Sequence, residues 1–80
     1  MILVEVYSKD DCHLCDVALS TLERIRRSHP FELVVIKIQE GKEHFDEFKE
    51  RIPVIFIDKK FAFQHRVQER EFIAKLSHTE

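Results

Sequence analysis

The sequence predicts one α/β domain in which a central four-stranded mixed sheet is flanked by helices, and two observations predict it. Short apolar runs alternate with stretches whose apolar residues recur at helical spacing, in the order βαβαββα. The chain has 80 residues, which suits a single compact core. We therefore assign residues 1–80 to one domain.

The first half of the chain reads as a strand, a helix and a second strand. Residues 2–7 are mostly apolar, and apolar residues recur at helical spacing over residues 12–28. Pro30 marks the end of that helix, because proline forces the preceding residue out of helical geometry. Residues 31–38 form the second strand. Its run 33–36 has no polar residue, which favours a central position in the sheet, between helices.

The second half begins with a polar stretch that becomes a short helix. This helix is expected between Gly41, the only glycine, and Pro53. A strand, a tight turn, a partner strand and a last helix follow at residues 54–57, 58–60, 61–63 and 67–76. A hairpin that follows a strand–helix–strand unit makes the predicted sheet mixed.

Composition and charge narrow the classes of partner. The formal net charge is −2, which gives no field that would attract nucleic acid or an anionic membrane. The first apolar stretch is short, carries Glu5 and has no basic region before it, so neither a signal peptide nor a membrane span is expected. We expect a cytoplasmic protein. Cysteines in that reducing compartment are more often catalytic or metal-binding than structural.

The most informative motif is Cys12-His13-Leu14-Cys15, which holds both cysteines of the chain and opens the first predicted helix. Backbone N–H groups and the helix dipole at this position stabilise a thiolate, which is the nucleophile of thiol–disulfide exchange. By helix phase Cys15 falls on the apolar side, and Cys12 is turned about 60° toward the edge. We therefore expect Cys12 to attack a disulfide and Cys15 to resolve the mixed disulfide.

Charged neighbours of the motif shift the pKa of Cys12 in opposite directions. Lys9 and a protonated His13 favour the Cys12 thiolate, whereas three carboxylates disfavour it; these belong to Asp10, Asp11 and Asp16. We expect only a modest lowering of the pKa of Cys12, and a thiol titration that gave a value below about 5 would contradict this. Asp10 or Asp11 is also the expected cap of the helix.

Two segments resemble glutaredoxins, within the thioredoxin-like fold. They are Tyr7–Cys15, at the strand-to-helix junction, and Arg51-Ile52-Pro53-Val54, before the third strand, and the resemblance extends over essentially the whole chain. It implies that Pro53 is cis and lies against the cysteines. It also implies that the backbone beside Pro53, at Ile52, pairs with a bound peptide or glutathione, and that Lys9 contacts a glutathione carboxylate.

The chain departs from the glutaredoxin pattern after the hairpin. Glutaredoxins have a Gly-Gly pair there, followed by an Asp that holds the glutathione amino group, whereas this chain has Phe63-Gln64-His65-Arg66. Glycines allow a close backbone approach that larger residues do not. A rearranged substrate site would use Lys9, Gln64 and Arg66.

These observations predict a monomeric dithiol oxidoreductase that reduces protein or glutathione mixed disulfides. Its electrons would come from glutathione or from a flavin-dependent reductase, and no bound cofactor or metal is expected. One alternative is a metal or iron–sulfur carrier that uses Cys12 and Cys15, although zinc usually needs four ligands and the sequence has no second close Cys/His pair. Another is a redox-inactive binding domain that uses the groove beside Pro53.

Overall fold

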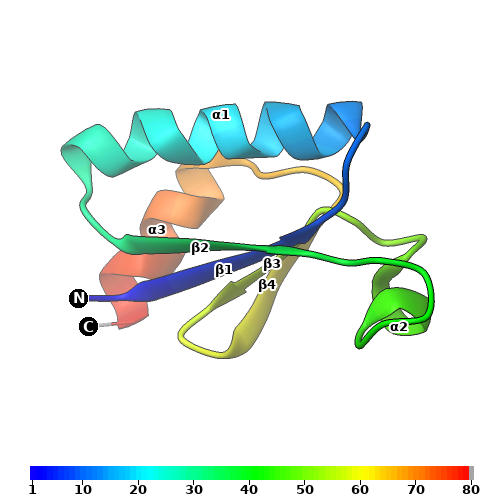
Figure 1. The fold of residues 1–80 in the computed structure, drawn as a ribbon. Helices are drawn as coiled ribbons and strands as arrows, with labels where there is room; N and C mark the ends of the chain where they lie inside the picture. Colours follow the sequence, from blue (N-terminus) through cyan, green and yellow to red (C-terminus); the bar gives the residue numbers. More distant parts are fainter. Residues whose placement is uncertain (80) are drawn as a thin grey trace.

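The computed structural model describes residues 1–79, and within them the elements follow the predicted order (Figure 1). They are β1 (Leu3–Ser8), α1 (His13–Ser28), β2 (Glu32–Lys37), α2 (Phe45–Phe48), β3 (Val54–Ile57), β4 (Lys60–Gln64) and α3 (Glu69–Thr79). The four strands of this described part form one mixed sheet. The predicted α/β fold with a four-stranded sheet and flanking helices is confirmed.

Strand β1 lies inside the sheet, whose order is β2-β1-β3-β4. It runs parallel to β2 and antiparallel to β3, and β3 runs antiparallel to β4. Val4 and Val6 of β1 are fully buried. The strand therefore links the core to the loop that carries the cysteine motif, which follows its carboxyl end.

The predicted central position of residues 31–38 is wrong, because β2 is an edge strand. Phe31 and Ile38, just outside the strand, are buried, but Val34 and Val35 are 36% and 40% exposed. An apolar run indicates a buried strand only where both faces and both edges are covered. Here the helices leave the apolar positions at the middle of the strand partly uncovered.

The main core lies between the sheet and the two long helices. We define it by buried residues that include Val4, Leu22, Ile55, Phe72 and Leu76, drawn from β1, α1, β3 and α3. Alternate residues of a strand point to opposite faces, so β1 and β3 each present one set of side chains to these helices. The helices α1 and α3 therefore cover the same face of the sheet.

A second group of buried side chains, the small cluster, lies at the carboxyl end of β1. It consists of Cys15, Ile38, Phe48, Ile52 and Val54. Tyr7, Cys12, Phe45 and Phe56 pack against it while partly exposed. The single turn of α2 contributes Phe48, so a short helix and two loops enclose this end of the molecule.

The β3–β4 hairpin turns through two residues, Asp58 and Lys59, whose φ angles are 46° and 71°. Two consecutive positive φ angles are typical of the tight hairpin turn whose twist matches that of the strands. The Asp58 Oδ1 atom accepts from the Leu3 N–H at 2.8 Å, and the Asp58 N–H donates to the Leu3 carbonyl at 2.8 Å. The turn therefore holds the start of β1.

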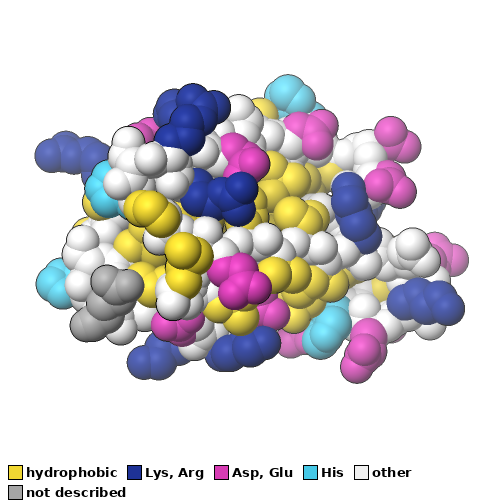
Figure 2. Space-filling model, turned by 60° about the vertical axis from the view of Figure 1, so that its left-hand side comes forward, with side chains coloured by type: hydrophobic (Ala, Val, Ile, Leu, Met, Phe, Trp, Pro, Cys, Tyr) yellow, Lys and Arg dark blue, Asp and Glu magenta, His cyan; other side chains and the backbone are white. Residues whose placement is uncertain are grey.

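Hydrophobic side chains form patches across the middle of the face seen in Figure 2, with charged side chains between and around them. The large hydrophobic side chains that are exposed on the molecule include Val34, Val35 and Phe61. None of the helices in residues 1–79 has the length and apolar character needed to cross a membrane.

Candidate active site

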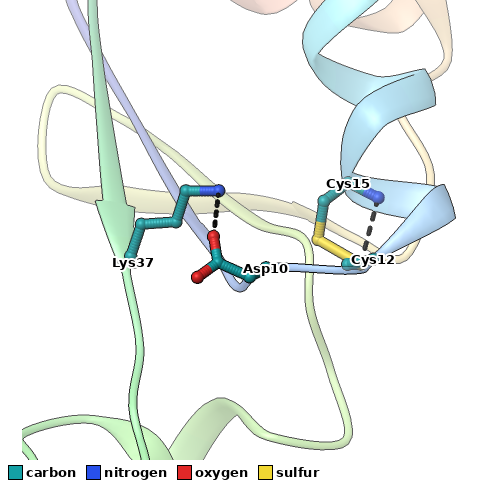
Figure 3. Close-up of polar contacts among 4 residues, drawn as sticks. All are labelled: Asp10, Cys12, Cys15 and Lys37. Atoms are coloured by element: carbon teal, nitrogen blue, oxygen red, sulfur yellow. Dashed lines mark hydrogen bonds and ion pairs between the residues drawn. A yellow bond between two sulfur atoms is a disulfide. The ribbon is translucent and has the colours of Figure 1, made fainter.

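Cys12 and Cys15 are joined as a disulfide at the amino end of α1, with their Cα atoms 5.2 Å apart (Figure 3). Cys12 is the N-cap residue, with extended φ and ψ of −116° and 103°, and its Sγ accepts from the Cys15 N–H at 3.2 Å. The predicted capping by Asp10 or Asp11 is therefore wrong. Asp11 has a φ of 56° and forms the turn before the cap, so the first residue able to cap the helix is Cys12 itself.

The two sulfur-bearing side chains differ in exposure. Cys15 is 1% exposed and belongs to the small cluster, whereas Cys12 is partly exposed at the helix end. Cys15 shares the buried face of α1 with Ala18, Leu22 and Ile25. This is the difference in shelter predicted from helix phase.

A lysine distant in sequence reaches the loop before the cysteines. The Lys37 Nζ atom, at the end of β2, lies 3.3 Å from the Asp10 Oδ1 atom, and Figure 3 shows the two side chains pointing toward each other. The carboxyl ends of adjacent parallel strands meet at one edge of a sheet, which is the signal that could have found Lys37. Lys9, Asp11 and His13, predicted as site residues, are exposed.

Pro53 directly precedes β3. The Ile52–Pro53 peptide bond is cis, as the resemblance implied, and Pro53 is fully buried. Ile52 and Val54, on either side of it, belong to the same small cluster as Cys15. The Ile52 side chain is therefore packed inside this cluster.

His65 connects the chain after β4 to the chain around Pro53. Its N–H donates to the Pro53 carbonyl at 2.9 Å, and its Nε2 atom lies 3.0 Å from the Glu50 carbonyl oxygen. Its φ of 69° is in the left-handed region, which non-glycine residues rarely adopt. The role of His65 was not predicted from the sequence. The departure from Gly-Gly at this position is the signal that could have indicated it.

Gln64 and Arg66 lie on either side of His65 in the same segment. The Gln64 Oε1 atom accepts from Arg51 Nε at 2.9 Å, and the Arg51 guanidinium carbon lies 5.3 Å from the centre of the Phe48 ring. Arg66 is exposed, and its N–H donates to the Gln64 carbonyl at 2.8 Å. The structure therefore brings Gln64 and Arg66 close to Pro53, whereas Lys9 lies in the loop before the cysteines.

Tyr7 forms part of the aromatic wall of the small cluster. Its ring centre lies 4.7 Å from that of Phe48 and 5.7 Å from that of Phe56. Burial, followed by the negative charge of Glu5, raises the pKa of Tyr7 above its ordinary value of 10.0. The nearby Lys59 ammonium acts in the opposite direction.

The described part of the chain, residues 1–79, has no group of three or more His, Cys, Asp or Glu side chains placed to hold a metal ion. When reduced, Cys12 and Cys15 would supply two thiolates. That is half of the usual tetrahedral set for zinc.

The sequence matches a known family along most of its length. The family described as "Glutaredoxin-like domain (DUF836)" matches residues 3–77. The chain is 30% identical over 72 residues to "Glutaredoxin-like protein YDR286C homolog" of Dictyostelium discoideum, covering 82% of this chain and 67% of that protein.

Solved structures share the fold. Protein Ne2328 from Nitrosomonas europaea superposes with a TM-score of 0.79 at 25% identity, over 92% of this chain and 89% of that one. Protein XcR50 from X. campestris gives 0.75 at 21% identity, over 94% and 96% of the two chains. Fasciola hepatica thioredoxin gives 0.65 at 14% identity, over 99% and 81%. With its thioredoxin-like fold, its Cys12-x-x-Cys15 motif and the match over residues 3–77, the chain belongs to the glutaredoxin-like domain family.

Proposed function

We propose that this protein is a dithiol thiol–disulfide oxidoreductase, with Cys12 as the nucleophile and Cys15 as the resolving thiol. The observation that carries the proposal is the unequal exposure of two cysteines at one helix end: Cys15 is 1% exposed and Cys12 is partly open to solvent. A substrate disulfide can therefore reach the sulfur of Cys12 but not that of Cys15. Membership of the glutaredoxin-like family supports redox chemistry of this general kind.

The first step is attack by the reduced Cys12 thiolate on one sulfur of a substrate disulfide. A bond forms between Cys12 Sγ and that sulfur, the substrate S–S bond breaks, and the second substrate sulfur leaves as a thiolate that takes up a proton. The Cys15 N–H, which donates to Cys12 Sγ in the oxidised protein, is positioned to stabilise a negative charge on the same atom.

The second step is attack by Cys15 on Cys12 Sγ. This reaction forms the Cys12–Cys15 disulfide seen in the structure and releases the remaining substrate thiol, so the substrate gains two electrons and the protein loses two. The close Cα–Cα distance of 5.2 Å allows this attack without rearrangement of the helix. Two glutathione thiols, or a flavin-dependent reductase, would return the electrons.

Pro53 and the segment His65–Arg66 form the other wall of the proposed substrate site. Their support is that Ile52 and Val54 share the small cluster with Cys15, and that His65 bonds the Pro53 carbonyl. Proteins with an accessible disulfide are the proposed substrates. We propose the cytoplasm as the site of action, because a reducing compartment would return the pair to the thiol form that reacts.

The two cysteines offer a matched pair of variants that test the mechanism. Cys12→Ser should abolish reduction of insulin, whereas Cys15→Ser should still attack and then accumulate a mixed disulfide, visible by mass spectrometry. Circular dichroism would show that both variants remain folded. Wild-type protein that reduces no disulfide with either donor, or mixed disulfides that accumulate on Cys15 in the Cys12→Ser variant, would contradict the proposal.

A further inference from the structure

A groove of about 400 Å³ lies beside the cysteine pair, between α1 and the segment that follows β4. Its lining includes His13, Leu14, Val17, Thr21, His65 and Arg66. The first four belong to successive turns of α1, and the last two precede α3. The groove is therefore formed where the start of one helix meets the chain that leads into the other.

The groove adjoins both halves of the proposed site. His13 and Leu14 are the residues between Cys12 and Cys15, so the groove starts at the motif itself. His65, on the opposite wall, donates its N–H to the Pro53 carbonyl at 2.9 Å. A protein segment bound with its disulfide at Cys12 would therefore place the residues next to that disulfide along this groove.

Part of the groove lining is apolar. Leu14 and Val17 are 40% and 49% exposed, and they belong to the small set of large hydrophobic side chains that the molecule leaves open to solvent. Neither residue belongs to the main core. An apolar side chain of a partner would cover them and remove their surface from water.

The polar part of the groove lining includes a positively charged side chain. Arg66 is exposed and lines the groove together with His13 and His65, and none of the lining residues is an Asp or Glu. A nearby carboxylate on α3, that of Glu69, is bound to Arg24. A guanidinium fork matches a carboxylate in geometry and in charge.

We propose that this groove binds the segment of a substrate protein that flanks the reactive disulfide, and that it selects an acidic residue together with a leucine-sized apolar one. The apolar side chain covers Leu14 and Val17, and the carboxylate pairs with Arg66. The inference rests on the proposed oxidoreductase function and specifies the substrate of that same site.

The test uses short peptides whose single cysteine carries 5-thio-2-nitrobenzoate as a mixed disulfide. Attack by Cys12 on the peptide sulfur breaks that S–S bond and releases the coloured thiolate, and Cys15 then frees the peptide thiol. Two peptides differ only in having Glu or Lys beside a Leu–Cys pair. The ratio of their second-order rate constants with reduced wild-type protein is the reference.

Arg66→Glu should lower the Glu/Lys ratio by about fivefold or more, because it replaces an attraction by a repulsion at a partly exposed site. The matched control is Arg70→Glu, which makes the same charge change at an exposed residue of α3 outside the groove lining. It should leave the ratio within about twofold of wild type. Equal effects of the two variants would show a general field and overturn the proposal.

Val17→Ser tests the apolar part with a second pair of peptides, in which Leu is kept or replaced by Ser. The preference for Leu should fall by about threefold, because the bound peptide would bury only the exposed part of the Val17 side chain. If the rate of thiolate release depends on neither Glu nor Leu, the groove proposal is overturned while the oxidoreductase function stands. An Arg66→Glu variant that slows a glutathione mixed disulfide as much as the peptides would also overturn it, since the groove would then receive glutathione. No release from any disulfide would instead contradict the oxidoreductase function.

Discussion

The main core and the small cluster differ in how they are built, although α1 and β3 contribute buried residues to both. The main core contains only apolar side chains, and two long helices close it against the sheet. The small cluster contains Cys15, is flanked by partly exposed aromatic rings and is closed by the single turn of α2. The main core therefore supplies most of the apolar burial, and the small cluster holds the sheltered Cys15 next to the partly exposed Cys12.

This difference indicates a division of labour in a chain of only 80 residues. A small domain has few kilocalories of stability to spare, so groups that must react are best kept apart from those that hold the fold. Substitutions in the main core should then change stability without changing the rate per folded molecule. Substitutions in the small cluster should change both.

The largest effect is expected from Phe72→Ala in the main core. Phe72 is fully buried, and its ring centre lies 5.4 Å from that of Phe31 and 6.2 Å from that of Phe63. Loss of the ring should lower the free energy of unfolding by about 4 kcal/mol, measured by urea denaturation. If the variant proves too unstable, Phe72→Leu should lose about 1.5 kcal/mol or less and reduce disulfides at the wild-type rate. A rate that fell with stability would break the comparison.

A somewhat smaller loss is expected from Phe48→Ala in the small cluster, about 3 kcal/mol by the same measurement. Its ring packs on Tyr7 and beneath the Arg51 guanidinium, and its carbonyl accepts from the Ile52 N–H at 3.1 Å. The chain before Pro53 would lose its packing, so disulfide reduction should slow by about tenfold. Unchanged kcat/KM would show that the small cluster does not position the site.

The His65 link should contribute about 1 kcal/mol, because His65→Ala removes the hydrogen bond from the ring to the Glu50 carbonyl. His65→Gly loses the same bond but adopts the φ of 69° without the penalty of about 1 kcal/mol that a side chain incurs there. The glycine variant should therefore be the more stable of the two in urea denaturation. The opposite order would show that left-handed geometry is not maintained at this position.

The smallest effect concerns Tyr7 at high pH. Burial keeps the pKa of Tyr7 above 10.0, so as the pH rises past 10.0 the unfolded chain loses this proton before the folded one. The ionisation of Tyr7 therefore leaves the free energy of unfolding unchanged well below pH 10.0 and lowers it as the pH rises above that value. Absorbance of the only tyrosine should report the shifted titration directly, and Tyr7→Phe should reduce the alkaline loss of stability. A titration midpoint at or below 10.0 would contradict this.

Most elements of the fold were predictable from local patterns. The strand–helix junction at Cys12, the end of the first helix before Pro30 and the hairpin after Pro53 depend on residues close in sequence. The edge position of β2 was not predictable, because the apolar run around Val34 and Val35 does not reveal which neighbours cover it. Strand order depends on contacts between distant segments.

The candidate site also combines features set by nearby residues with features that join distant segments. The exposure of Cys12 and the shelter of Cys15 followed from helix phase, since both lie within one turn. The Asp10–Lys37 ion pair and the bond from His65 to Pro53 join residues far apart in sequence, which periodicity cannot pair. Helix capping by Cys12 depended on the left-handed turn at Asp11, for which nothing in the residue spacing gave a signal.

The hairpin turn that holds Leu3 has a practical consequence for handling the molecule. With Asp58 bonded to the backbone of Leu3, the first strand is anchored at the end where α3 also finishes, and Figure 1 places that end opposite the amino end of α1. An affinity tag, a fluorophore or a surface linker attached ahead of Leu3 would extend away from the cysteines. The protein can thus be immobilised by this end, with the proposed nucleophile Cys12 facing the solution, to test for capture of disulfide-bearing partners.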